Sequence, residues 1–116
     1  MANTTFLGPV IVNSVGNGLT AAGTTRADAL QLKSQVNVVA TANASTGVIL
    51  PVGEIGMVVT VFNNGANAIV VYANGSETID GTAGATGVAL TNAKRCNYYF
   101  TASSTWVSAQ LGVVSA

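Results

Sequence analysis

The stretch NNGANAIVVYANGSETIDGTAGATG, residues 63–87, decides the fold, because its glycines and asparagines fit two different structures. A glycine-rich loop that cradles phosphate follows a strand, opens a helix, and supplies a lysine and a hydroxyl group. Here GTAGATG (81–87) leads into VALTN, which has the pattern of a strand, and it contains no lysine. The stretch therefore predicts turns between strands, with tight hairpins at residues 63–67 and at Asn74-Gly75.

Apolar runs rich in β-branched residues lie on both sides of this stretch. They recur about every ten residues between Gly, Asn and Ser turns, which is typical of an antiparallel sandwich or barrel. The expected strands are residues 35–42, 47–51, 56–63, 68–73, 87–91, 95–101 and 105–111. The predicted fold class is therefore all-β, a single domain built as an antiparallel, jelly-roll-like β-sandwich. The one candidate for a helical turn is TTRADALQLKSQ (24–35), which Thr25 could cap.

The composition predicts a protein that works within an assembly. The 116 residues fit one domain, and 49% of them are hydrophobic while only 7% are charged. A soluble surface is usually about a quarter charged, with a net charge away from zero. Here four basic and four acidic side chains give a net charge of zero. Disordered chains are polar, so disorder does not explain this composition. We expect a folded protein whose surface is largely covered by neighbouring subunits.

The same composition argues against several classes of function. Four scattered cations are too few for a nucleic-acid footprint, and no apolar run reaches the length of about eighteen residues of a membrane span. The start MANTTFLGPV lacks the basic and apolar regions of a secretory signal, so we expect folding in the cytoplasm. Without histidine, the Ser–His and Cys–His dyads and the usual zinc sites cannot form. We therefore predict no enzyme activity, catalytic residue, cofactor or metal.

Two carboxylates and one thiol are the remaining candidates for chemistry. Glu77 and Asp80 could share a Ca²⁺ ion or act as a glycosidase pair. Calcium, however, needs six to eight oxygen ligands, and a glycosidase needs a sugar-binding groove that nothing in the sequence marks. The favoured interpretation is that both are solvated loop charges. Cys96 is the only cysteine, and a buried, reduced thiol is favoured over an intermolecular bridge or a reactive thiol.

The aromatic residues have two interpretations. Phe62, Phe100 and Trp106 are assigned to the core of the sandwich. In the alternative, Trp106 joins Tyr72 and Tyr99 in a platform that stacks on sugars. The expected strands 56–63 and 68–73 are apolar on both faces, which predicts a covered outer face or a contact between subunits.

A family resemblance agrees with this interpretation. The progression from GVILP (47–51) through GMVVTVFNNGANAIVVYANGSETIDG (56–81) to ALTNAKRCNYYFTASSTWVSA (89–109) resembles a module of small virion structural proteins of tailed bacteriophages. The opening TTFLGPV (4–10) is also similar to the start of such proteins. One departure is that relatives often carry a proline-bearing turn after the tyrosine, where this chain has Ala-Asn-Gly (73–75).

The resemblance implies a head decoration, or cement, protein that stabilises the capsid from its exterior. Such proteins are commonly jelly-roll-like homotrimers that bind at junctions between subunits of the major capsid protein. The implied partners are thus the major capsid protein and further copies of this chain. Two alternatives remain: a fibre or tail attachment module that binds host glycans, and a non-viral adhesin or pilus-like subunit, which the missing secretory signal disfavours.

The N-terminal region is predicted to act as an arm. Residues 1–23 are assigned to this arm and residues 24–116 to the β-sandwich domain. An apolar cluster in the arm is expected to grip the capsid or a neighbouring subunit, by adding a strand to the edge of its sheet. The alternative is an edge strand of the chain's own sandwich. The cluster consists of Phe6, Leu7, Pro9, Val10, Ile11 and Val12.

Overall fold

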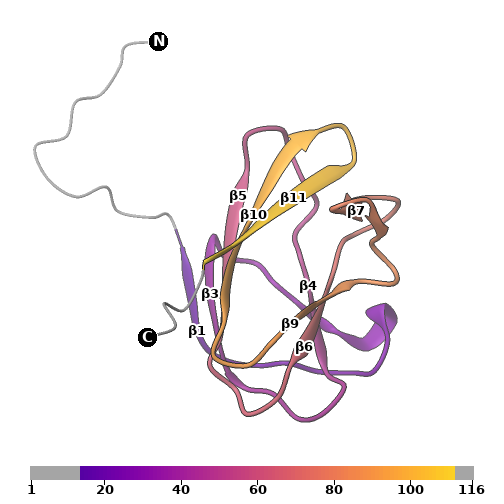
Figure 1. Ribbon diagram of the computed structural model, residues 1–116. Helices are drawn as coiled ribbons and strands as arrows, with labels where there is room; N and C mark the ends of the chain where they lie inside the picture. Colours follow the sequence, from indigo (N-terminus) through magenta and orange to yellow (C-terminus); the bar gives the residue numbers. More distant parts are fainter. Residues whose placement is uncertain (1–13, 112–116) are drawn as a thin grey trace, which may run out of the picture.

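The computed structural model describes residues 14–111, which form two facing β-sheets (Figure 1). A 3₁₀ helix, η1 (Arg26–Asp28), is the helical element of this range. The four-stranded sheet has the order β2 (Leu30–Gln31), β4 (Gly47–Ile49), β6 (Ile69–Tyr72) and β9 (Val88–Leu90). The seven-stranded sheet has the order β1 (Val15–Thr20), β3 (Val36–Thr41), β5 (Val58–Asn63), β10 (Arg95–Ala102), β11 (Thr105–Leu111), β7 (Thr78–Ile79) and β8 (Thr82–Ala83).

The N-terminal half winds between the two sheets. Successive strands from β1 to β6 alternate between the seven-stranded and the four-stranded sheet. Each strand therefore pairs in parallel with the strand one turn later: β1 with β3 and β3 with β5 in one sheet, β2 with β4 and β4 with β6 in the other. This is a β-solenoid arrangement. The C-terminal half then adds the antiparallel pairs β6–β9, β5–β10, β10–β11 and β7–β8.

The predicted all-β single domain is confirmed, but the antiparallel, jelly-roll-like sandwich is wrong. An apolar alternation with period two is the same for parallel and antiparallel strands, so it carries no information on direction. Direction depends on the connections. A tight turn returns the chain antiparallel beside the strand it has just left, whereas a connection through the other sheet brings it back parallel.

The predicted strands correspond to β3, β4, β5, β6, β9, β10 and β11, and the short or irregular strands were missed. Within residues 24–35 only η1 is helical, and β2 follows it. Strand β1 lies inside the predicted arm, yet it pairs with β3, and Ala21 directly after it is buried in the core. Residues 15–21, which the sequence assigned to the arm, thus pack with the β-domain.

The hairpin predicted at residues 63–67 is also wrong, because this segment is a corner between sheets. Strand β5, before it, and strand β6, after it, belong to different sheets. The Asn63 side chain is fully buried there: its Nδ2 donates to the carbonyl oxygens of Asn67 (2.9 Å) and Leu90 (3.0 Å), and its Oδ1 accepts from Gly65 N (3.0 Å). At Gly65 a Cβ would lie 2.6 Å from the Ala42 Cβ, so close approach to the neighbouring corner requires glycine.

The turn at Asn74-Gly75 crosses between the sheets as well, and leads from β6 to β7. Gly75 has a φ of +54°, which is the conformation expected of glycine in a turn. Asn74 Nδ2 donates to Leu50 O at 2.7 Å, and Arg26 Nη1 donates to Ala73 O and Gly75 O at 3.0 and 2.7 Å. These bonds attach the turn to β4 and to η1.

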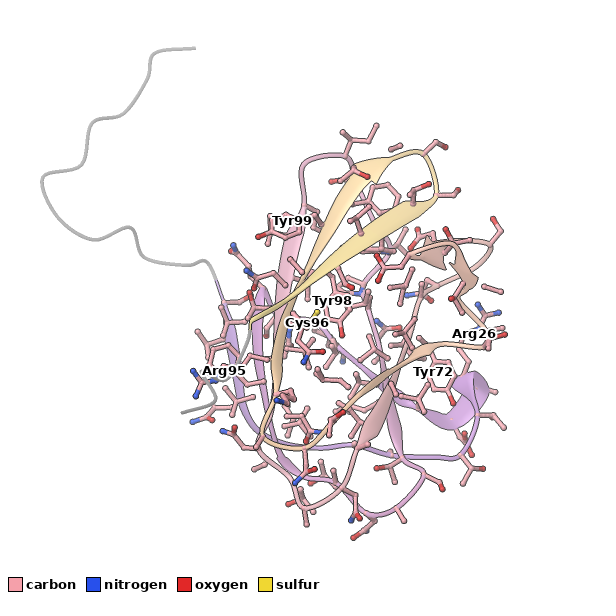
Figure 2. The ribbon with its side chains drawn as sticks, viewed as in Figure 1. Arg26, Tyr72, Arg95, Cys96, Tyr98 and Tyr99 are labelled. Atoms are coloured by element: carbon pink, nitrogen blue, oxygen red, sulfur yellow. The ribbon has the colours of Figure 1, made fainter. Side chains whose placement is uncertain are left out.

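The core lies between the two sheets, where Tyr98 and Cys96 are directed in Figure 2. Trp106 is fully buried and Phe100 nearly so, with their ring centroids 5.0 Å apart at 75°. Phe62, which was also assigned to the core, is instead half-buried on the outer face of its sheet. The reason is the alternation along β5, which directs Val59 and Val61 inward and leaves Phe62 outside.

We predict that Asn63→Ala lowers the free energy of unfolding by about 3 kcal/mol, because it removes three hydrogen bonds at a buried corner. Asn64→Ala is the matched control. Its side chain is exposed, and its backbone N–H, which donates to Val39 O at 2.9 Å, is kept, so we expect a change within about 0.5 kcal/mol. Urea denaturation measures both variants. Equal midpoints would contradict the role of the buried amide.

Candidate interaction surface

The outer face of the seven-stranded sheet carries apolar side chains that the core does not use. Residues directly opposite one another on neighbouring strands point to the same face, so the strand registers define rows across it. One row holds Val107, Tyr99 and Val58, the next holds Ala109, Asn97, Thr60, Val36 and Val15, and the third holds Arg95, Phe62 and Val38. We call these eleven residues the apolar outer face.

Much of the apolar outer face is open to solvent. Val15 is 56% exposed, Val107 42% and Tyr99 36%, whereas Val58 and Phe62 are half-buried by their neighbours. The four-stranded sheet packs against the opposite side, and Arg95 lies on the outer side, away from the core (Figure 2). Apolar side chains of this face are thus left partly uncovered by the core.

The polar groups of the apolar outer face bond to one another. Thr60 Oγ1 donates to Asn97 Oδ1 at 2.7 Å, and Asn97 Nδ2 donates to Tyr99 Oη at 3.2 Å. The Arg95 guanidinium, the one charged group of the face, lies 5.3 Å from the centre of the Phe62 ring. The side chains of Thr60, Asn97 and Tyr99 are thus already paired with one another, which lowers the cost of covering them, whereas the Arg95 guanidinium must stay in solvent or receive an acceptor from the partner.

A second apolar feature, the loop of residues 51–56, stands beside this face. Val52 is 66% exposed and Ile55 73%. A hollow of about 290 Å³ separates Ile55 from Tyr99 and so adjoins the apolar outer face. Since Gly56 N donates to Phe100 O at 3.0 Å, the loop is tied to β10.

A buried carboxylate holds this loop in place. Glu77 Oε2 accepts from Gly53 N at 3.1 Å, and Glu77 Oε1 accepts from Trp106 Nε1 at 2.9 Å. Gly53 sits so close to Phe100 that a Cβ would overlap the ring. Two hydrogen bonds and an aromatic contact therefore fix the backbone that presents Val52 and Ile55.

The interpretation of Glu77 as a solvated loop charge is wrong, because this side chain is only 9% exposed. Its partners are 24 and 29 residues away, so no local pattern could have revealed them. Asp80 is exposed and accepts hydrogen bonds from Ser108 N, at 2.8 Å, and from Ser108 Oγ. Glu77 and Asp80 therefore accept hydrogen bonds from different residues. In the described range no cluster of three or more His, Cys, Asp or Glu residues could hold a metal ion.

The sugar platform considered for Trp106, Tyr72 and Tyr99 does not form. Trp106 is fully buried and Tyr72 is 6% exposed, so only Tyr99 presents its ring to solvent. The arm cluster from Phe6 to Val12 lies outside the described residues.

Burial also governs the titration of two inward-facing groups on β10. It raises the pKa of the Cys96 thiol, and it raises the pKa of the Tyr98 phenol well above its ordinary value. Both side chains are therefore held in their neutral, protonated forms, and Cys96 belongs to the core as a buried free thiol.

Comparison with known proteins identifies no relative: no family model, no curated protein and no solved structure matches this chain. No helix within residues 14–111 is long and apolar enough to cross a membrane.

We predict that Glu77→Gln lowers the free energy of unfolding by about 1–3 kcal/mol. One carboxylate oxygen becomes an NH₂ group, which then faces the N–H donor of either Trp106 or Gly53 inside the protein. Glu54→Gln makes the same chemical change at an exposed position of the same loop and should leave stability within about 0.5 kcal/mol. Urea denaturation followed by tryptophan fluorescence measures both. If the two variants are equally stable, Glu77 does not hold the loop.

Alkaline pH should destabilise the fold through Tyr98. Its pKa is higher in the folded than in the unfolded chain, so its contribution is complete below the ordinary tyrosine value of about 10 and is lost as pH rises above it. Tyr98→Phe removes this proton and should flatten the fall in unfolding free energy between about pH 9 and 11. Tyr99→Phe makes the same chemical change on the outer face and is the matched control. An unchanged slope in Tyr98→Phe would assign the alkaline loss to other groups.

Proposed function

We propose that this chain is a structural virion protein that decorates and stabilises the capsid of a tailed bacteriophage, as a homotrimer bound at junctions between major capsid subunits. The apolar outer face is the observation that carries the proposal. An exposed apolar face with internally paired polar groups is suited to a neighbouring subunit, and such patches mark interaction sites on soluble proteins. The resemblance to small phage virion proteins indicates a phage capsid as the assembly.

The arrangement of the two apolar features supports a ring of copies. A closed ring is built from heterologous contacts, in which one surface of each subunit meets a different surface of the next. The apolar outer face offers one surface, and the loop of residues 51–56, which Glu77 holds in place and which exposes Val52 and Ile55, offers the other. Packing of the loop of one copy on the outer face of the next would cover both.

The charge content supports the same proposal. With four cations and four anions in the whole chain, the surface has little charge to oppose association of identical copies. Three capsid-binding elements carried by one trimer would act together, so the trimer would bind a lattice more tightly than any one contact allows.

The glycan-binding alternative has lost its main support. Its proposed platform depended on Trp106 and Tyr72, and both rings are buried. The proposal of a structural subunit does not require a ring exposed for stacking.

We predict that Val107→Lys converts the trimer into a monomer of 11.6 kDa, because it places a charge on the apolar outer face, beside Tyr99. Ala89→Lys adds the same side chain at an exposed position of β9, in the other sheet, and should remain trimeric. Sedimentation at micromolar concentration distinguishes the two states. A trimeric Val107→Lys variant would exclude this face, and a monomeric wild-type protein would exclude the trimer itself.

Electron cryomicroscopy of particles mixed with the wild-type protein tests the partner. Decoration predicts density at regular lattice positions on the head, lost with Val107→Lys and kept with Ala89→Lys. Density confined to fibres or tail, together with glycan binding, would support the attachment module instead.

A further inference from the structure

A groove of about 320 Å³ opens along the first turn of the solenoid. Strands β1 and β2 are the edges of their respective sheets, so on this side no further strand closes the space between the sheets in the described part of the chain. Three leucines, Leu19, Leu30 and Leu32, give the groove an apolar wall, and the side chains of Gln31, Lys33 and Ser34 also line it. Terminal turns of solenoids expose their core in this way unless something caps them.

A buried side-chain oxygen that accepts no hydrogen bond, Asn37 Oδ1, faces this groove. Asn37 is 1% exposed, and its Nδ2 donates to Ser34 O (2.9 Å) and Thr60 O (3.2 Å). Carbonyl oxygens only accept hydrogen bonds, so these two bonds fix the orientation of the amide. The Asn37 Oδ1 atom is then left with no hydrogen bond.

The surroundings of Gly16 show where this oxygen points. A Cβ on Gly16 would lie 3.5 Å from Asn37 Oδ1 and 3.3 Å from both Ser34 Oγ and Leu19 Cδ1. Gly16, Leu19, Ser34 and Asn37 all line the groove. The site thus combines an apolar wall, polar side chains and one buried oxygen without a partner, and it suits an occupant that brings apolar side chains and an N–H or O–H donor.

We propose that the groove binds the apolar segment of residues 6–12 from a second copy of this chain, in extended conformation, with a backbone N–H of that segment donating to Asn37 Oδ1. The proposal rests on the homo-oligomer proposed above. Addition of an extended segment to an exposed sheet edge is an established mode of recognition, in which main-chain hydrogen bonds provide affinity and alternate side chains fill pockets.

The chemistry of residues 6–12 matches the groove. The segment FLGPVIV contains no charged or polar side chain, so it can contact the leucine wall without burying a charge. Its backbone supplies N–H donors at every residue except Pro9. A volume of about 320 Å³ is at the lower end of the range for binding pockets, enough for part of the segment while the rest lies along the edge of β1.

The connection to β1 favours the segment of another copy over the chain's own. Only Asn13 separates the segment from Ser14, whose Oγ accepts from Gln35 N and whose carbonyl accepts from Val36 N, both at 3.2 Å. To enter the groove beside its own β1, the chain would have to reverse direction within residues 6–13. The turn would consume part of the apolar run, whereas a neighbouring copy can contribute the whole run.

Hydrogen exchange on the full-length protein tests the groove. We expect the amides of residues 6–12 to exchange about tenfold more slowly in the wild type than in Ser34→Phe, whose ring fills the groove. Ser76→Phe introduces the same ring at an exposed loop position that does not line the groove, and it should keep the protection. Wild-type exchange at the rate of an unstructured segment would overturn the proposal, as would equal protection in Ser34→Phe.

Cysteine crosslinking identifies which copy provides the segment, with only modest changes of side chain. In the full-length double variant Val10→Cys/Ser34→Cys, oxidation should link different chains into multimers, whereas Ser34→Cys alone should not form them. The native Cys96 is buried and should not contribute. If all the disulfides that form are intrachain, the assignment to a second copy is overturned. If no disulfide forms between positions 10 and 34, the groove is not the binding site.

These outcomes are separable from those of the proposed function. A trimer that decorates particles but shows no protection of residues 6–12 overturns the groove alone. A wild-type protein that sediments as a monomer overturns the homo-oligomer, and with it the exchange of segments between copies.

Discussion

Every turn of the solenoid must carry the chain from one sheet to the other across the edge of an apolar core. At each crossing the backbone leaves a hydrogen-bonded ladder, and its polar groups need new partners because burying them unpaired is costly. Side-chain amides provide these partners. Asn63 bonds three backbone groups at one corner, Asn74 bonds Leu50 O at another, and Gln31 Nε2 donates to Leu32 O, Ile49 O and Leu50 O.

This use of amides also relates the fold to its composition. A neutral amide can donate and accept inside a protein without the desolvation cost of an ion, so corners built with Asn and Gln need no charged residues. Two charged side chains are exceptions: Arg26 donates to Ala73 O and Gly75 O, and the buried Glu77 accepts from the indole N–H of Trp106 and the N–H of Gly53. The low charge that suggested an assembly component therefore also reflects how the corners are built, because most of their backbone groups bond to neutral Asn and Gln side chains.

The two surfaces proposed to bind partners, the apolar outer face and the groove between β1 and β2, result from the same architecture. Strand β5 fills the core with its inner face and also carries Val58 and Phe62 on its outer face, a pattern that favours a covered outer face. An unclosed first turn leaves the space between β1 and β2 open, with Asn37 Oδ1 unpaired beneath it. In the assembly proposed here, neighbouring copies would complete both.

The sequence by itself determined seven of the eleven strands in the described residues, the all-β class and the single domain, because β-branched alternation and Gly/Asn turns are local properties of the chain. It also indicated that strand 56–63 has two apolar faces. It could not assign Phe62 to the outer face, since alternation defines two sides without saying which one meets the core.

Only the tertiary structure decided the direction of the strands, the corner at residues 63–67 and the burial of Glu77. Each depends on contacts between residues distant in sequence: a corner and a hairpin use the same Asn and Gly residues, and they differ only in whether the next strand joins the same sheet. Glu77 accepts from Trp106, 29 residues away, and a carboxylate in a loop carries no local mark of such a partner. Local chemistry thus fixed where the chain turns, and packing between the two sheets fixed where each turn leads.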